Sequence, residues 1–86
     1  MKKKFNIGVI GLGYVGLPLA LKLGKFFNVV GYDTSNMKVK NLKKGIDINK
    51  EVKKKEFRLS KKLIFTTDKQ LLKKCNVYII TVPTTI

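Results

Sequence analysis

The sequence predicts an α/β fold with a parallel β-sheet, and its pattern of elements supports this in two ways. Four short apolar runs rich in β-branched residues alternate with segments that show helical spacing. Strands that alternate with helices form parallel sheets with right-handed crossover connections. The first strand also passes into the first helix through a cluster of glycines. With 86 residues, the chain is expected to form one small domain.

The first strand is expected over Phe5–Ile10, and it leads into a G-x-G-x-x-G sequence. In a strand–turn–helix context, Gly11 permits the tight turn and Gly13 lets backbone N–H groups approach a pyrophosphate. Gly16 allows the helix to pack closely on the strand. Because a helix N-terminus has free N–H groups and the positive end of the helix dipole, it favours an anion there.

The first helix is expected to run from Tyr14 to Phe26. Pro18 falls in its first turn, where the missing N–H costs little. Lys22 and Lys25 mark the solvent side. The apolar residues that recur at helical spacing, and so are expected to face the sheet, are Val15, Leu19, Leu23 and Phe26.

The second strand, Asn28–Asp33, ends in an acidic residue. Asp33 lies 22 positions after Gly11, close to the roughly 20 residues at which a carboxylate binds the adenosine ribose hydroxyls of a dinucleotide. The turn and the carboxylate together predict a dinucleotide site, with NAD favoured over NADP because a carboxylate repels a 2′-phosphate. The alternative is a glycine-rich turn that only connects a strand to a helix.

A second helix is expected over Asn36–Lys44. Thr34 or Ser35 can cap its N-terminus, and Gly45 can end it. Its inward-facing residues are expected to be Val39 and Leu42.

The second half of the chain is expected to add strands over Leu63–Thr66 and Asn76–Val82. A short helix around Val52–Phe57 precedes the first, and a brief helix capped by Thr67 or Asp68 precedes the second. Strand order 3-2-1-4 would make this a partial Rossmann-like sheet, with a ligand crevice at the carboxyl ends of strands 1 and 4.

The net charge of +14 raises the question of nucleic-acid binding. The lysines are spread through every segment, and Arg58 is the only arginine. No aromatic side chains are interleaved with them as a base-stacking platform requires. We therefore expect no nucleic-acid partner.

No apolar run approaches the ~18 residues of a membrane span, and no signal-peptide pattern follows the basic start. We expect a cytoplasmic protein without membrane contact. The single cysteine, Cys75, and the absence of histidine predict no metal site. Because Cys75 precedes the fourth strand, away from the crevice, it is expected to be a packing residue and not a nucleophile.

Four motifs together resemble the N-terminal part of the nucleotide-sugar 6-dehydrogenases. The chain is more similar to the UDP-N-acetylhexosamine branch than to UDP-glucose dehydrogenase, and the resemblance covers essentially all 86 residues. One departure is Thr85, where the family usually has proline. The motifs are Gly11–Ala20, Gly31–Asp33, Gly45–Asp47 with Glu51–Val52, and Ile80–Thr84.

The resemblance implies that residues 1–86 are the N-terminal part of an NAD-binding Rossmann domain. The parent enzyme would oxidise a sugar C6 alcohol to a carboxylate by two hydride transfers to NAD. Its catalytic residues and its UDP-sugar domain would lie later in the chain, so no catalytic residue is assigned here. The expected cofactor-binding residues are Gly11, Gly13, Tyr14, Val15, Gly16, Asp33, Lys38, Thr81 and Thr84.

Other interpretations remain open from the sequence. The parent could be a UDP-glucose 6-dehydrogenase, or the chain could be a non-catalytic dinucleotide-binding module.

The fourth strand contains no lysine or proline over Val77–Ile80 that would discourage pairing at a sheet edge. We therefore also expect a homo-oligomer, most simply a two-fold dimer.

Overall fold

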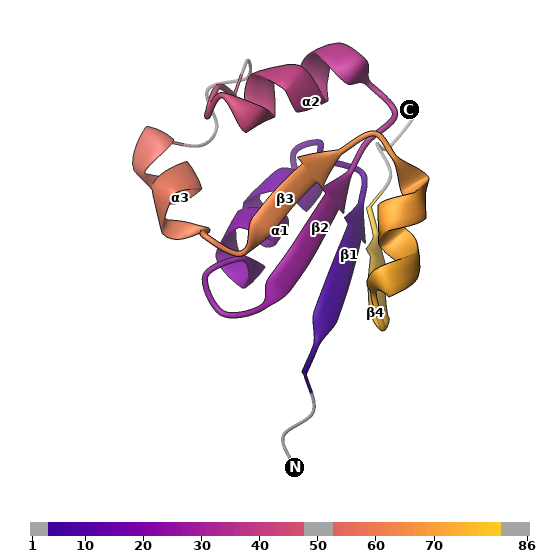
Figure 1. Cartoon of the computed structure of the whole chain (residues 1–86). Helices are drawn as coiled ribbons and strands as arrows, with labels where there is room; N and C mark the ends of the chain where they lie inside the picture. The colour runs from indigo at the N-terminus through magenta and orange to yellow at the C-terminus, as the bar shows by residue number, and fades with distance from the viewer. Residues whose placement is uncertain (1–3, 48–52, 82–86) are drawn as a thin grey trace.

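Four parallel strands form one sheet in the order β3-β2-β1-β4 (Figure 1), which confirms the predicted strand order. The computed structural model describes residues 4–47 and 53–81. The strands are β1 (Asn6–Ile10), β2 (Asn28–Tyr32), β3 (Leu63–Thr66) and β4 (Val77–Ile80).

Helical segments connect the strands, as the alternating pattern predicts. The connection between β1 and β2 contains α1, and the described part of the β2–β3 connection contains α2 and α3. The last connection contains the brief helix expected there, which is a 3₁₀ helix, and Asp68 is the cap that it uses. These segments are α1 (Gly16–Leu23), α2 (Asn36–Lys43), α3 (Lys54–Leu59) and η1 (Lys69–Lys74).

The strand register aligns the carboxyl ends of the sheet. Ile10 is opposite Tyr32 on one side and Ile80 on the other, and Tyr32 is opposite Thr66. The chain that leaves β1 therefore emerges between the ends of β2 and β4, where the topology places a ligand site.

The hydrophobic core lies on one face of the sheet, which α1, α2 and α3 cover. Figure 1 shows α1 behind the strands, with α2 and α3 toward the β3 side. Val77 and Ile79 of β4 pack against this core and are only partly buried. The buried core residues are Ile7, Val9, Leu12, Leu17, Ala20, Leu21, Val29, Val39, Leu42 and Phe65.

The opposite face of the sheet carries η1. A Cβ atom placed on Gly8 of β1 would lie 2.9 Å from the Leu72 side chain and 3.3 Å from Cys75 Sγ, so η1 approaches β1 closely. The Tyr78 hydroxyl donates to the carbonyl oxygens of Leu72 at 2.5 Å and Cys75 at 3.0 Å. These hydrogen bonds fasten η1 to the edge strand β4.

The predicted length of the first helix is wrong, and its predicted face is wrong in part, because Leu23 packs against the core as expected but Val15 and Phe26 do not. Val15 and Phe26 are 69% and 68% exposed, and the helix begins at Gly16 and ends at Leu23. The glycine turn includes Val15, so a helical count that starts there has the wrong phase. The buried face is made of Gly16, Leu17, Ala20 and Leu21.

The second helix agrees with its prediction, apart from ending one residue early. Of the two candidate caps, Ser35 is used, and its side chain accepts a hydrogen bond from the Lys38 N–H at 3.2 Å. Gly45 has φ +75°, and the N–H groups of Gly45 and Ile46 donate to the carbonyls of Leu42 and Asn41. This is a Schellman motif, which a glycine at this position favours.

Two of the later elements are shifted from the predicted ranges. Helix α3 spans Lys54–Leu59 and not Val52–Phe57, and a 2.9 Å ion pair joins its Glu56 to Lys25 beyond α1. The fourth strand begins one residue late and ends at Ile80. Thr81 lies beyond the strand, and Val82 lies outside the described residues.

Replacement of Leu42 by alanine should lower the free energy of unfolding by about 2–5 kcal/mol, because it leaves a cavity under α2. Leu42 is 3% exposed, whereas Met37 on the same helix is 71% exposed. Met37→Ala should change the free energy of unfolding by no more than about 0.5 kcal/mol. Urea unfolding followed by circular dichroism measures both, and equal effects would contradict this packing of α2.

Candidate dinucleotide site

The glycine turn begins where β1 ends, between two neighbouring strands. The Gly11 N–H donates to the Tyr32 carbonyl at 2.8 Å, and the Thr81 N–H donates to the Ile10 carbonyl at 2.8 Å. Gly11 has φ +100°, and a Cβ atom there would collide with the Thr81 backbone. Only glycine fits this position, in agreement with the role assigned to Gly11 as the tight turn.

Gly16 starts α1 directly against this turn. A Cβ atom on Gly16 would collide with the Gly11 carbonyl and the Thr81 hydroxyl. The close packing of helix on strand that the motif predicts is therefore present. It also brings the N-terminus of α1 to the carboxyl end of β1.

Gly13 is surrounded differently from the other two glycines. A Cβ atom there would meet no protein atom within 4 Å. The protein itself therefore leaves open the space that a side chain would fill. The N-terminus of α1 has no side-chain cap and no acidic residue in its first turn, which suits an anion bound at this end of the helix.

The side chains of Tyr14 and Val15 lie on the outside of the turn. Each is 69% exposed. Both residues follow Gly13 directly in the sequence, so their backbone is part of the same turn. Tyr14 is also one of the residues that line the pocket between α1 and α2, whereas Val15 is not among them.

Asp33 follows β2 and bonds to the turn. Its Oδ2 accepts a hydrogen bond from the Leu12 N–H at 2.9 Å, and its Oδ1 accepts one from the Ser35 N–H at 3.0 Å. Lys38 Nζ lies 3.8 Å from Asp33 Oδ2. The structure therefore brings Asp33, Lys38 and the glycine turn together, as the predicted site requires.

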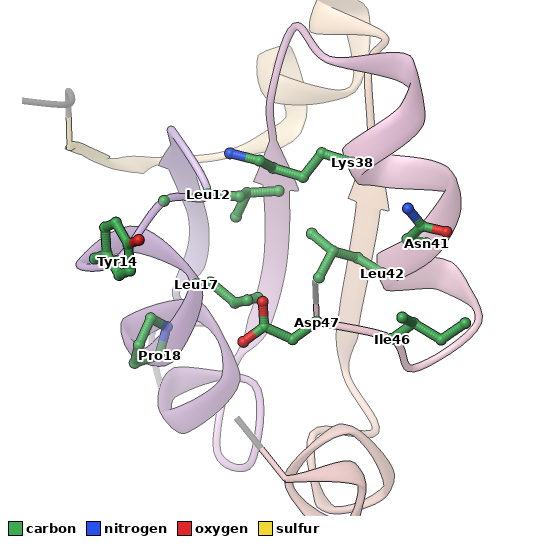
Figure 2. A pocket seen from close by; sticks show the side chains of 10 residues that line it. Leu12, Tyr14, Leu17, Pro18, Lys38, Asn41, Leu42, Ile46 and Asp47 are labelled. Atoms are coloured by element: carbon green, nitrogen blue, oxygen red, sulfur yellow. The ribbon is translucent and has the colours of Figure 1, made fainter. Parts of the chain in front are cut away.

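A pocket lies between α1 and α2, next to the glycine turn. Figure 2 shows side chains from both helices directed into it, together with the carboxylate of Asp47. Ile46 and Asp47 belong to the Gly45–Asp47 motif, but neither they nor Asn41 were among the predicted cofactor-binding residues. The lining residues are Leu12, Gly13, Tyr14, Leu17, Pro18, Lys38, Asn41, Leu42, Ile46 and Asp47.

Thr81 reaches the turn from the end of β4. Its Oγ1 donates to the Gly11 carbonyl at 2.8 Å and lies 3.3 Å from the Ile10 carbonyl. The hydroxyl is therefore engaged with the backbone of the turn. Thr84, the other threonine predicted on this loop, lies outside the described residues.

Several polar residues lie away from this site. Asp68 caps η1, where its carboxylate accepts from the Gln70 N–H at 2.9 Å. Glu56 accepts a hydrogen bond from Lys25, which lowers the pKa of its carboxyl.

Across residues 4–47 and 53–81, no group of three or more His, Cys, Asp or Glu gathers as metal ligands would. No helix in these ranges is both long and apolar enough to span a membrane.

Comparisons with known proteins match nearly the whole chain to one family model. The model of the UDP-glucose/GDP-mannose dehydrogenase family, NAD binding domain, matches residues 5–86. The UDP-N-acetyl-D-glucosamine 6-dehydrogenase of Salmonella typhi is 50% identical over 81 residues, which are 94% of this chain and 19% of that protein. The corresponding Pseudomonas aeruginosa enzyme is 48% identical over 98% of this chain and 20% of its own length.

Among solved structures, GDP-mannose dehydrogenase from Pseudomonas aeruginosa matches with a TM-score of 0.81 and 28% identity, over 94% of this chain and 20% of that chain. That structure is a ternary complex. The chain therefore spans about one fifth of the length of the relatives it matches.

Replacement of Gly13 by valine should abolish NAD binding with little loss of stability. A Cβ atom at this position meets no protein atom within 4 Å, but the valine side chain would occupy the space that a pyrophosphate needs. Calorimetric titration with NAD and thermal unfolding measure the two effects. Wild-type affinity in Gly13→Val would show that the phosphate site lies elsewhere. The control is Gly16→Ala, which should destabilise the fold because its Cβ collides with the turn.

Cys75 should resist alkylation in the folded chain. Its side chain is 8% exposed, and burial raises the pKa of its thiol. Less thiolate is then present near neutral pH, and reagents have little access to it. The rate at which iodoacetamide alkylates Cys75 should be lower by about tenfold or more in the folded chain than in the chain in urea. Similar rates would contradict the assignment of Cys75 as a packing residue.

Proposed function

The chain belongs to the UDP-glucose/GDP-mannose dehydrogenase family, and we propose that it forms the NAD-binding part of a UDP-N-acetylhexosamine 6-dehydrogenase. The proposed parent activity is oxidation of the sugar C6 alcohol to a carboxylate, in the synthesis of polysaccharide precursors. The proposed location is the cytoplasm, and the proposed substrate is a UDP-sugar bound by the parent protein.

One observation carries the proposal. A Cβ atom on Gly13 would meet no protein atom within 4 Å. The α1 helix begins three residues later, at Gly16, and the Asp33 carboxylate accepts a hydrogen bond from the N–H of Leu12, the residue before Gly13. A pyrophosphate fits the open space because backbone N–H groups and the helix dipole favour its charge. The ribose hydroxyls of NAD fit the Asp33 side because a carboxylate accepts hydrogen bonds from them.

Bound NAD would supply the hydride acceptor for both oxidation steps. The residues of this chain bind and orient it. Gly11 shapes the turn, Gly13 leaves room for the pyrophosphate, and Asp33 accepts hydrogen bonds from the ribose. Lys38 lies close enough to Asp33 to bring a positive charge to the adenosine side of the site.

The choice of sugar rests on the relatives. Two that are 50% and 48% identical are named UDP-N-acetyl-D-glucosamine 6-dehydrogenases. A third, from Pyrococcus horikoshii, is named a UDP-N-acetyl-D-mannosamine dehydrogenase and is 38% identical. These names favour an N-acetylhexosamine over glucose.

Self-association is proposed through the edge strand β4. Tyr78 and Ile80 point to the same face of the sheet and are 49% and 68% exposed. Exposed apolar side chains on an edge strand favour pairing with another chain.

The parent activity is tested by expressing the gene with any coding sequence that follows codon 86. We expect NADH formation with UDP-N-acetylglucosamine or its mannosamine epimer, in a ratio of two NADH per sugar. Faster turnover of UDP-glucose would favour the UDP-glucose 6-dehydrogenase alternative. NAD binding without oxidation of any UDP-sugar would favour the non-catalytic module.

NAD should bind at least about tenfold more tightly than NADP, a difference of about 1.4 kcal/mol. The Asp33 carboxylate would repel the 2′-phosphate, and Lys38 is a nearby cation that offsets part of this repulsion. Calorimetric titration with both cofactors checks the ratio. Asp33→Asn should narrow the ratio and Lys38→Ala should widen it. Equal or tighter NADP binding by the wild-type chain would contradict the role of Asp33.

A further inference from the structure

The peptide group between Gly11 and Leu12 is held at both of its ends by side chains. Its carbonyl oxygen accepts the Thr81 hydroxyl at 2.8 Å, and its N–H donates to Asp33 Oδ2 at 2.9 Å. Thr81 follows β4, and Asp33 follows β2. Two strands that flank β1 therefore hold one peptide of the glycine turn from opposite sides.

This arrangement extends the hydrogen bonding of the sheet by one peptide group. The preceding peptide, between Ile10 and Gly11, is held by backbone groups: its N–H donates to Tyr32, and its carbonyl accepts from the Thr81 N–H. Beyond it the turn leaves the plane of the sheet, and backbone partners are replaced by the two side chains. Thr81 donates a hydrogen bond to each of the two peptides, from its N–H to the first and from its hydroxyl to the second.

From this geometry we propose that Thr81 is a positioning residue for NAD binding, which acts on the cofactor through the Gly11–Leu12 peptide. The proposal rests on the proposed NAD site. Gly11 has φ +100°, and glycine tolerates a wide range of backbone angles. Without restraints on both sides, this peptide can rotate and the turn loses its NAD-binding form.

Asp33 thereby has a second role. Its carboxylate restrains the turn through Leu12 as well as serving as the ribose acceptor. The loss of NAD affinity in an Asp33 variant therefore combines two effects. Thr81 offers a way to test the turn separately, because its hydroxyl is directed at the backbone of the turn.

The main variant is Thr81→Val, which keeps the shape of the side chain and removes the hydroxyl. We expect about threefold to tenfold weaker NAD binding by calorimetry, the effect of losing one hydrogen bond. Thr81→Ser keeps the hydroxyl and should bind within about twofold of wild type. Thr66→Val is the matched control, because Thr66 ends β3 and its hydroxyl accepts from the Asp68 N–H. It should leave NAD affinity unchanged.

Amide hydrogen exchange in the ligand-free chain separates positioning from direct contact. Thr81→Val should accelerate exchange of the Leu12 N–H, on the far side of the same peptide, while the Val9 N–H in the middle of β1 stays protected. Weaker NAD binding with unchanged Leu12 exchange would show direct contact with the cofactor and overturn the proposal. Unchanged affinity and exchange would also overturn it.

Two further comparisons keep the test decisive. If Thr81→Val does not fold, Thr81→Ala against Thr81→Ser makes the same comparison. Combined with Asp33→Asn, Thr81→Val should weaken binding less than the product of the single effects, because both side chains restrain one peptide. If the wild-type chain does not bind NAD, the proposed function fails, whereas the exchange measurement still judges the restraint by Thr81.

Discussion

The close contact between the glycine turn and the end of β4 determines how the rest of the site is built. Side chains at Gly11 or Gly16 would collide with Thr81 or with the turn itself. Because these positions have none, α1 begins directly beside the carboxyl end of β1. The helix N-terminus then faces the same space as the Asp33 carboxylate. A looser packing would separate the two groups that a dinucleotide must bind together.

The three positions of the motif require glycine for different reasons in this chain. Gly11 and Gly16 are required by neighbouring protein atoms, whereas a Cβ atom on Gly13 would meet no protein atom within 4 Å. A purely structural turn needs the first two and has no use for the third. The open space at Gly13 therefore argues against a turn that only connects a strand to a helix.

The sheet order, the glycine turn and the position of Asp33 near that turn could be predicted from the sequence. The inward residues Val39 and Leu42 could be predicted as well, because each of these features depends on local chemistry or on spacing. The face of α1 was predicted correctly only at Leu23. Helical periodicity gives the relative positions of residues but not the residue at which the helix starts. Here the buried face combines two small residues, Gly16 and Ala20, with the leucines that follow them. Apolar side chains at Val15 and Phe26 gave a stronger but misleading pattern. The hydrogen bond between Gly11 and Thr81 joins residues that are 70 positions apart. Such a contact depends on the register of the strands, and a residue pattern does not specify register closely enough to predict a single hydrogen bond.

The position of Thr81 gives the edge strand a direct connection to the site. β1 and β2 lie inside the sheet, and β4 is at the edge of its described part. On β4, the side chains of Tyr78 and Ile80 are more exposed than those of Val77 and Ile79. The residue that follows β4 is bonded to the end of β1 by its N–H, which donates to the Ile10 carbonyl, and to the glycine turn by its hydroxyl, which donates to the Gly11 carbonyl. The glycine turn therefore rests on the strand at the described edge of the sheet, and its form depends on where that strand ends.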